Sequence, residues 1–451
     1  MSRNLIKHGR ETLALGLPLI GSHLAQMALH VTDTILMGRY GVDELAAVVI
    51  SGSAFFVVFI FGAGFAQAIM PLIAAAVGRG DETEVRRDAR MGLWLSLGYG
   101  LLTYPLFWTS GQWLRALGQA PEVAEFGQQF LRIAGPGMVP ALLVMALKSY
   151  LSALGRTQVV LWVTLGAVLV NLGVGYTLIF GHWGAPRLGV RGAAISTLTV
   201  QWVTFLVLGL YAHYAPGLRR YHLFSRFWRA DPAALKRVFR LGWPIGVTGL
   251  AESGLFSSAS VMMGWVSTVA LAAHGIAMQV AALAFMVHLG LSNAATVLLG
   301  RAEGARDYKT LRDAALAAIA LSVGFGAVMI AAFLILPVPI LSLFLDPSEP
   351  AAPEILRVGT VLLALAALFQ LGDAMQVMAL GFLRAIRDTK VPMWAAAASY
   401  WVVGLPCSYI LGFKLGLGSV GIWLGLVMGL ACASVSLMLR FWRKAPQPVT
   451  S

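Results

Sequence analysis

The stretch LGWPIGVTGLAESGLFSSASVMMGWV, residues 241–266, decides how the chain folds. It is apolar and long enough to span a bilayer, and it repeats an earlier part of the sequence: residues 15–81 align without a gap on residues 241–307. The matching pairs include Gly16 with Gly242, Pro18 with Pro244, Leu24 with Leu250, Ala25 with Ala251, Met37 with Met263, Gly38 with Gly264, and LAA at 45–47 with LAA at 271–273. The chain therefore consists of two similar halves.

The composition is that of an integral membrane protein. Of the 451 residues, 58% are hydrophobic and only 12% are charged, and the mean hydropathy is +0.78. A soluble domain of this length would need far more polar surface. We therefore predict an all-α membrane protein with twelve transmembrane helices, centred near residues 25, 60, 100, 140, 170, 202, 252, 285, 325, 370, 402 and 429.

The net charge of +13 follows from the placement of basic residues and does not indicate a nucleic-acid partner. Lys and Arg gather near both termini and in alternate loops, as in 79–90, 219–240, 301–312 and 384–390. Intervening loops are poor in them, which is the pattern of cytoplasmic loops alternating with external ones. We therefore expect both termini to be cytoplasmic and the number of spans to be even.

The repeat also predicts the domain organisation. We expect an N-lobe of six helices over 1–214, a basic cytoplasmic linker over 215–239, and a C-lobe of six helices over 240–451. Two halves with an even number of spans share one orientation, so a pseudo-two-fold axis along the membrane normal would relate them. Rocking of two such lobes about a cleft would give alternating access.

Three acids lie well inside predicted spans: Asp33, Glu252 and Asp373. Glu252 aligns with Gln26 in the first half and Asp33 aligns with Ala259 in the second, so the acids are not a symmetric structural pair. An acid inside a span normally marks an ion or substrate path. The alternative is that each acid accepts hydrogen bonds from neighbouring hydroxyl groups and holds helices together.

The motifs LGLPLIGSHLAQMALHVTDTILMGRYG at 15–41, LGWPIGVTGLAE at 241–252, and FQLGDAMQVMALGFLRAIRDTK at 369–390 carry a family resemblance. Together they resemble multidrug and toxic compound extrusion (MATE) transporters of the NorM-like branch. The resemblance implies a monomeric antiporter of the bacterial inner membrane, without enzymatic activity, catalytic residues or cofactor. Such an antiporter exports cationic or amphipathic organic compounds in exchange for sodium ions or protons.

The resemblance also implies where ions or substrates bind. In the C-lobe the matching positions are Glu252, Asp373 and Gln279, with Phe369 where relatives often carry Tyr; in the N-lobe they are Asp33, Asn171 and Thr197. Sodium would bind at Glu252 with Asp373, or at Asp33 with Asn171, because hard cations prefer oxygen ligands. Phe369 would offer an aromatic face to an organic cation or serve as packing. Gly175 stands where relatives often have a second polar residue, which weakens the N-lobe site.

Two other classes of function remain open. A lipid-linked oligosaccharide flippase of the related superfamily would need a cationic cavity for pyrophosphate, and Lys148 is the only basic residue near a helix centre that would suit it. A membrane-embedded enzyme would need a catalytic motif, and no HExxH, GxSxG or Walker A sequence occurs. The buried acids instead favour cationic or neutral substrates over strongly anionic ones, and leave sodium and proton coupling equally open.

Overall fold

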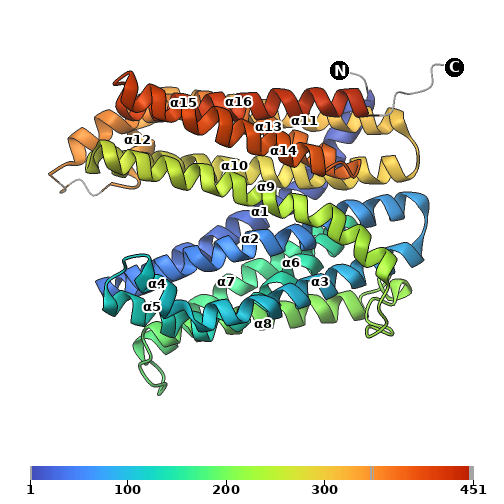
Figure 1. Cartoon of the computed structure of the whole chain (residues 1–451). Helices are drawn as coiled ribbons and strands as arrows, with labels where there is room; N and C mark the ends of the chain where they lie inside the picture. The colour runs from blue at the N-terminus through green and yellow to red at the C-terminus, as the bar shows by residue number, and fades with distance from the viewer. Residues whose placement is uncertain (1–2, 346–347, 349, 446–451) are drawn as a thin grey trace. The chain divides into compact units, whose positions relative to one another are not determined.

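Figure 1 shows the computed structural model of the chain, in which residues 3–345, 348 and 350–445 are described. The first half contains α1 (Arg3–Gly38), α2 (Val42–Arg79), α3 (Glu82–Trp108), the short α4 (Ser110–Ala116), α5 (Pro121–Ala134), η1 (Gly135–Gly137), α6 (Met138–Ala153), α7 (Thr157–Phe180) and α8 (Val190–Tyr214). The second half contains α9 (Pro232–Val266), α10 (Thr268–Gly304), α11 (Tyr308–Ile335), the short α12 (Pro337–Ser342), α13 (Ala352–Ala385), α14 (Lys390–Ala398), η3 (Ser399–Gly404), α15 (Leu405–Tyr409), η4 (Ile410–Lys414) and α16 (Gly418–Lys444).

The predicted all-α fold is confirmed, and each of the twelve predicted helix centres lies in a helix of the described residues. Ten helical segments among these residues are long and apolar enough to cross a membrane, counting Pro121–Ala153 and Lys390–Lys414 as single segments. The two remaining long helices are α3 and α9. Helix α9 has lower hydropathy because it contains Glu252 and several serines, and α3 because its apolar part is rich in Gly, Tyr and Trp.

The helices repeat between the two halves, as the sequence predicts. Helices α1 and α9 have 36 and 35 residues, α2 and α10 have 38 and 37, and α3 and α11 have 27 and 28. A helix cap repeats as well: the Asp81 carboxylate accepts the backbone N–H of Glu84 at 2.9 Å, and the Asp307 carboxylate accepts that of Thr310 at 3.0 Å. The two aspartates occupy equivalent positions in the alignment.

The helices form two compact units that do not coincide with the two sequence halves. One unit is Gly21–Gly246, and the other is Met1–Ile20 with Val247–Ser451. Both boundaries lie inside a helix, two residues after Pro18 in α1 and two residues after Pro244 in α9. The first helix of each half therefore contributes to both units, whereas the sequence analysis divided the chain at the 215–239 linker.

Close backbone contacts explain why α1 and α9 are shared in this way. A side chain at Gly64 of α2 would place its Cβ 2.4 Å from the backbone nitrogen of Gly246 in α9. At the equivalent Gly290 of α10, a Cβ would lie 2.8 Å from the backbone nitrogen of Ile20 in α1. Small residues at helix contacts in membranes permit this approach. The same glycine contact therefore secures the start of α9 in one unit and the start of α1 in the other.

Helix α13 lies at the centre of the unit that contains Val247–Ser451, where it packs against both α10 and α16 (Figure 1). Hydroxyl groups of α10 fix its position. Ser292 Oγ donates to the carbonyl of Val377 at 2.7 Å, and Thr296 Oγ1 lies 3.1 Å from the carbonyl of Gly381. Such hydrogen bonds between helices are effective in a bilayer because lipid offers no competing partner. These hydrogen bonds from α10 fix the position of α13, the helix that carries Asp373.

The basic segment before α9 is attached to α3 by ion pairs. Asp231 lies just before Pro232, and its Oδ1 accepts the backbone N–H of Ala234 at 3.1 Å, so it caps α9. Arg87 donates to both carboxylate oxygens of Asp231, from Nη2 at 3.1 Å and from Nε. These hydrogen bonds from Arg87 lower the pKa of Asp231 to about 2.

We predict that Asp231→Asn lowers the melting temperature of the purified protein by about 2 °C at neutral pH, since the ion pair is partly exposed and therefore of modest strength. An unfolded aspartate has a pKa of about 3.9, above the folded value. The stabilisation is therefore complete above pH about 4 and is lost as the pH falls toward 2. Melting curves across this range should converge for the two proteins. If the melting temperatures of the two proteins differ equally at all pH values, the ion pair with Arg87 is not the cause of the stabilisation. The control is Glu122→Gln, which changes an exposed acid.

Candidate functional site

Glu252 lies at mid-length in α9, in the stretch from which the sequence analysis began. Its carboxylate Oε1 accepts a hydrogen bond from the Gln376 amide nitrogen of α13 at 2.9 Å. Beside it, the indole nitrogen of Trp401 donates to the backbone carbonyl of Ala251 at 3.1 Å. Glu252 is therefore held by α13, and its helix is tied to the 390–414 segment one residue away.

Asp373 of α13 is the second acid of this cluster and is only 3% exposed. It lies close enough to Glu252 for the two carboxylates to interact electrostatically. Among the described residues, its Oδ1 has no hydrogen-bond partner, and neither amide atom of Gln370 has one. An unsatisfied buried polar atom costs free energy that a bound partner would recover. The structure thus brings together Glu252 and Asp373, as predicted.

Three further polar residues join these acids, and the sequence analysis did not select them. Gln370, Asp373 and Gln376 recur at three-residue spacing along α13, which places them on one side of the helix. The fully buried Tyr400 lies close enough to both acids to interact electrostatically. The spacing of polar residues in FQLGDAMQ was the signal available for the two glutamines. Tyr400 carried no such signal, because its approach depends on how the 390–414 segment packs.

Arg384 also lies close enough to Glu252 to interact electrostatically. The sequence analysis placed Arg384 in a cytoplasmic loop cluster, but α13 continues to Ala385 and so includes it. This correction gives Glu252 a cationic neighbour. The cause is that α13 extends about four helical turns beyond its predicted centre near residue 370.

Gln279 and Phe369 are the other two C-lobe residues that the resemblance implicated. Gln279 is half-buried on α10, and within the described part of the chain no hydrogen bond joins it to Glu252 or Asp373. Phe369 is 2% exposed, and its ring lies 6.0 Å from that of Phe256 and 5.7 Å from that of Trp423 between ring centres. Its environment is that of a packing residue, the alternative already considered for it.

His274 of α10 links its helix to α16 and α9. Trp423 of α16 donates its indole N–H to His274 Nδ1 at 3.1 Å, so His274 carries its own proton on Nε2, which lies 3.1 Å from Ser260 Oγ of α9. Both ring nitrogens are thus used in hydrogen bonds between helices. This geometry is that of a neutral structural histidine.

The N-lobe residues form a second cluster, within the unit Gly21–Gly246. The Asn171 amide nitrogen of α7 donates to Asp33 Oδ1 of α1 at 2.8 Å, and Ser196 Oγ of α8 donates to the Asn171 amide oxygen at 3.0 Å. Asp33 and Asn171 therefore meet, as predicted. Asn171 presents its nitrogen and not its oxygen to the acid, so in this arrangement it is a hydrogen-bond donor.

Thr197 takes no part in this cluster, and its neighbour Ser196 does. The Thr197 hydroxyl donates to the carbonyl of Ala193 in its own helix at 3.1 Å. A side chain at Gly175 would place its Cβ 3.0 Å from Leu36 Cδ1 and 3.4 Å from Ser196 Oγ. The space that a polar residue would occupy at position 175 is thus already filled, and Ser196 supplies the local hydroxyl.

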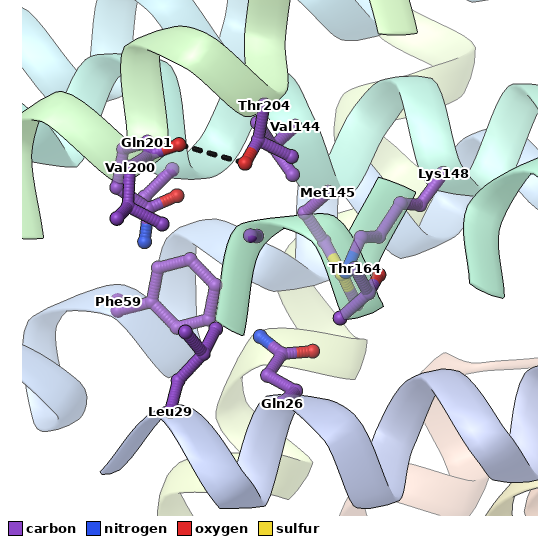
Figure 2. Close-up of a pocket in the computed structure, with 12 residues that line it drawn as sticks. Gln26, Leu29, Phe59, Val144, Met145, Lys148, Thr164, Val200, Gln201 and Thr204 are labelled. Carbon is purple, nitrogen blue, oxygen red and sulfur yellow. Dashed lines mark hydrogen bonds between the residues drawn. The ribbon is translucent and has the colours of Figure 1, made fainter. Parts of the chain in front are cut away.

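A cavity of about 40 Å³ opens in the same unit, among α1, α2, α6, α7 and α8 (Figure 2). Its lining comprises Gln26, Leu29, Phe59, Ala141, Val144, Met145, Lys148, Thr164, Ala167, Val200, Gln201 and Thr204. Figure 2 shows the Lys148 side chain running from α6 toward Met145 and Thr164. Gln26, the equivalent of Glu252 in the first half, also lines it.

The residues around the two acid clusters bear on which ion they could hold. Across the described residues, no group of three or more His, Cys, Asp or Glu is arranged to hold a metal ion. Within the part of the chain that the structure describes, Asp373 Oδ1 has no hydrogen-bond partner, and the glutamine amides and the Tyr400 hydroxyl belong to the same cluster. That set of oxygen atoms suits a proton or a weakly bound hard cation such as sodium.

Comparisons with known proteins agree along the whole chain. The MatE family model matches residues 18–177 and 244–410, one segment in each half. The chain is 45% identical over 436 residues to the Probable multidrug resistance protein NorM of Rhizobium meliloti, covering 97% of this chain and 93% of that protein. It is 43% identical over 443 residues to the protein of the same name in Agrobacterium fabrum, covering 98% and 95%.

Solved structures agree with the fold. A multidrug resistance MATE family transporter of the MOP superfamily, solved in an outward-facing conformation, matches with a TM-score of 0.88. The match covers 99% of this chain and 98% of that one at 20% identity. A eukaryotic MATE transporter matches with a TM-score of 0.84 at 19% identity, covering 98% and 99%.

Proposed function

Since the chain belongs to the MatE family, we propose that it is a cation-coupled multidrug antiporter that exports cationic or amphipathic organic compounds by alternating access. The observation that carries the proposal is the pair of the half-buried Glu252 and the buried Asp373, two interacting acids from different helices inside the spans. Energy would come from a sodium or proton gradient, and the chain would need no cofactor or catalytic residue.

Competition at the acid pair would couple the two movements. A proton or sodium ion on Glu252 and Asp373 neutralises charge that a low-dielectric environment tolerates poorly. A cationic compound would neutralise the same charge, so the ion and the compound would not occupy the site together. Entry of the ion would then release the compound. Gln376, which donates to Glu252, would hold that carboxylate in place during the exchange.

We also propose how the chain is oriented in the membrane, from the placement of its basic residues. Basic residues precede α9 and flank the ends of the spans, which supports cytoplasmic termini. The likeness to bacterial NorM proteins supports a bacterial inner membrane. Six-helix lobes over 1–214 and 240–451, joined by 215–239, follow from the repeat. Because α1 and α9 each contribute residues to both compact units, these two helices would couple the units mechanically. The chain would act as a monomer in contact with lipid.

Proteoliposomes test the proposal directly. Efflux of a fluorescent organic cation should be driven by a sodium gradient at fixed pH, by a proton gradient without sodium, or by both. The dependence would identify the coupling ion. Movement of a lipid-linked sugar with no gradient-dependent movement of the cation would instead support the flippase.

We predict that Asp33→Asn lowers efflux about three- to tenfold. The asparagine oxygen can still accept from Asn171, but the acceptor loses its charge, which weakens the hydrogen bond by about 1 kcal/mol. Initial rates of cation efflux measure the effect. The matched control is Thr197→Val, which alters a hydroxyl that bonds only within its own helix. If Thr197→Val lowers efflux as much as Asp33→Asn does, the Asp33–Asn171–Ser196 cluster has no special role.

A further inference from the structure

The cavity in the unit Gly21–Gly246 has a charge opposite to that of the acid clusters. Lys148 is the only charged residue among those that line it, and no acidic residue does. The charged groups that act on Lys148 within the described residues include no carboxylate, while His23 lies close enough to interact with it electrostatically. The ammonium group is therefore a positive charge at the wall of a cavity, without an acid to neutralise it.

Four uncharged polar side chains also line this cavity, and only the two glutamines have donors that are free for a ligand. The hydroxyls of Thr164 and Thr204 donate to carbonyls of their own helices, Val160 and Val200, both at 2.7 Å. Among the described residues, no hydrogen bond is formed by the side chains of Gln26 or Gln201, so both amide N–H₂ groups are available. The available donors are thus one ammonium and two amides, a set suited to an anionic oxygen acceptor.

We propose that this cavity binds the carboxylate of an amphipathic organic compound, with Lys148 as its ion-pair partner and Gln26 and Gln201 as further donors. The inference deepens the proposed export of small molecules and rests on it. Leu29, Phe59 and Met145 would contact the adjoining apolar part of the compound. The chain would accept zwitterionic compounds, and Lys148 would determine that preference.

The size of the cavity fits a single acidic group and not a whole drug molecule. Its volume of about 40 Å³ holds about three water molecules, each needing about 10–15 Å³ by this measure. A carboxylate has three heavy atoms. A cationic group in so small a cavity would lie close to the Lys148 ammonium and be repelled by it. The cavity would therefore select against cationic groups and in favour of carboxylates.

The test uses rhodamine B and its ethyl ester, two dyes that share a cationic ring system and differ in a free carboxylate. Binding to the purified protein is measured by fluorescence anisotropy, and efflux is measured in proteoliposomes. Lys148→Gln should weaken rhodamine B binding about 10- to 100-fold, the usual effect of losing a charged hydrogen-bond partner. Binding of the ester should change less than about twofold, and Lys148→Arg should restore rhodamine B binding.

Controls separate this site from general damage. Lys236→Gln removes a lysine that is exposed at the start of α9 and should leave both dyes unaffected. Gln201→Leu keeps the charge and removes a neutral donor, so it should weaken rhodamine B alone, by about fivefold; it also serves as the test if Lys148→Gln does not fold. Equal losses for the two dyes, or none for either, would overturn the proposal. Failure of the wild type to export the ester would instead count against the proposed function.

Discussion

Replacing Glu252 with glutamine should reduce ion-coupled efflux of a cationic dye by at least about tenfold, while expression, membrane insertion and melting temperature stay close to wild type. Glutamine has nearly the same shape and can still accept the hydrogen bond from Gln376, so packing is preserved. It removes the titratable charge for which the ion and the compound would compete. A lost interaction with a charged group is worth about 1.5–3 kcal/mol, or about 10- to 100-fold.

The control is Glu354→Gln in the first turn of α13, in the same unit. The Glu354 side chain is 60% exposed, and its nearest ion-pair partner, Arg357, is 4.0 Å away, so its loss should have little effect. Efflux by Glu252→Gln at the wild-type rate, with unchanged dependence on sodium and pH, would show that Glu252 merely holds α9 and α13 together.

Asp373→Asn should reduce efflux as strongly as Glu252→Gln, and the double variant should be little worse than either single one. The reason is that the two acids interact within one site, so removing either already destroys the competition between ion and compound. Residues that act as a unit give strongly non-additive effects. The measurement is a double-mutant cycle: initial efflux rates of the wild type, the two single variants and the double variant, taken at equal protein density in the liposomes.

Independent roles would give a different result. If the losses in the double variant multiply, Glu252 and Asp373 belong to separate steps and the shared site is wrong. Asp33→Asn supplies the contrast, because Asp33 belongs to the other compact unit. Where the efflux of the Asp33→Asn and Glu252→Gln double variant is still measurable, its loss should be the product of the two single losses, as expected of residues that share no partner.

Much of the fold could be predicted from the sequence, because the bilayer leaves few alternatives. In hydrocarbon every backbone polar group must be satisfied within the chain, so an apolar run of about 20 residues becomes a helix. The gap-free alignment of 15–81 on 241–307 then fixed equal helix lengths in both halves. The sharing of α1 and α9 between units was not predictable in this way, because it depends on the contacts of Gly64 and Gly290 with residues far away in the chain.

The site was predictable only where a charge stood out against an apolar background. Glu252, Asp373 and Asp33 were recognisable because acids inside spans are expensive and therefore informative. Ser196 was missed in favour of its neighbour Thr197, since the choice depends on helix rotation, which hydrophobic sequences specify weakly. Arg384 was assigned to a loop because the sequence shows only that a basic residue stands near the end of a span. It does not show whether that side chain extends into solvent or lies near an acid.

The sharing of α1 and α9 also sets the order in which the protein can be assembled. The unit Gly21–Gly246 is continuous in the chain and has all its parts once synthesis passes residue 246. The other unit includes the beginning of the chain, whose contact at Ile20 is with Gly290 of α10. The first residues of α1 can therefore form their final contacts only after α10 has been synthesised. This part of α1 is thus synthesised long before α10 but reaches its final contacts only after α10 is present.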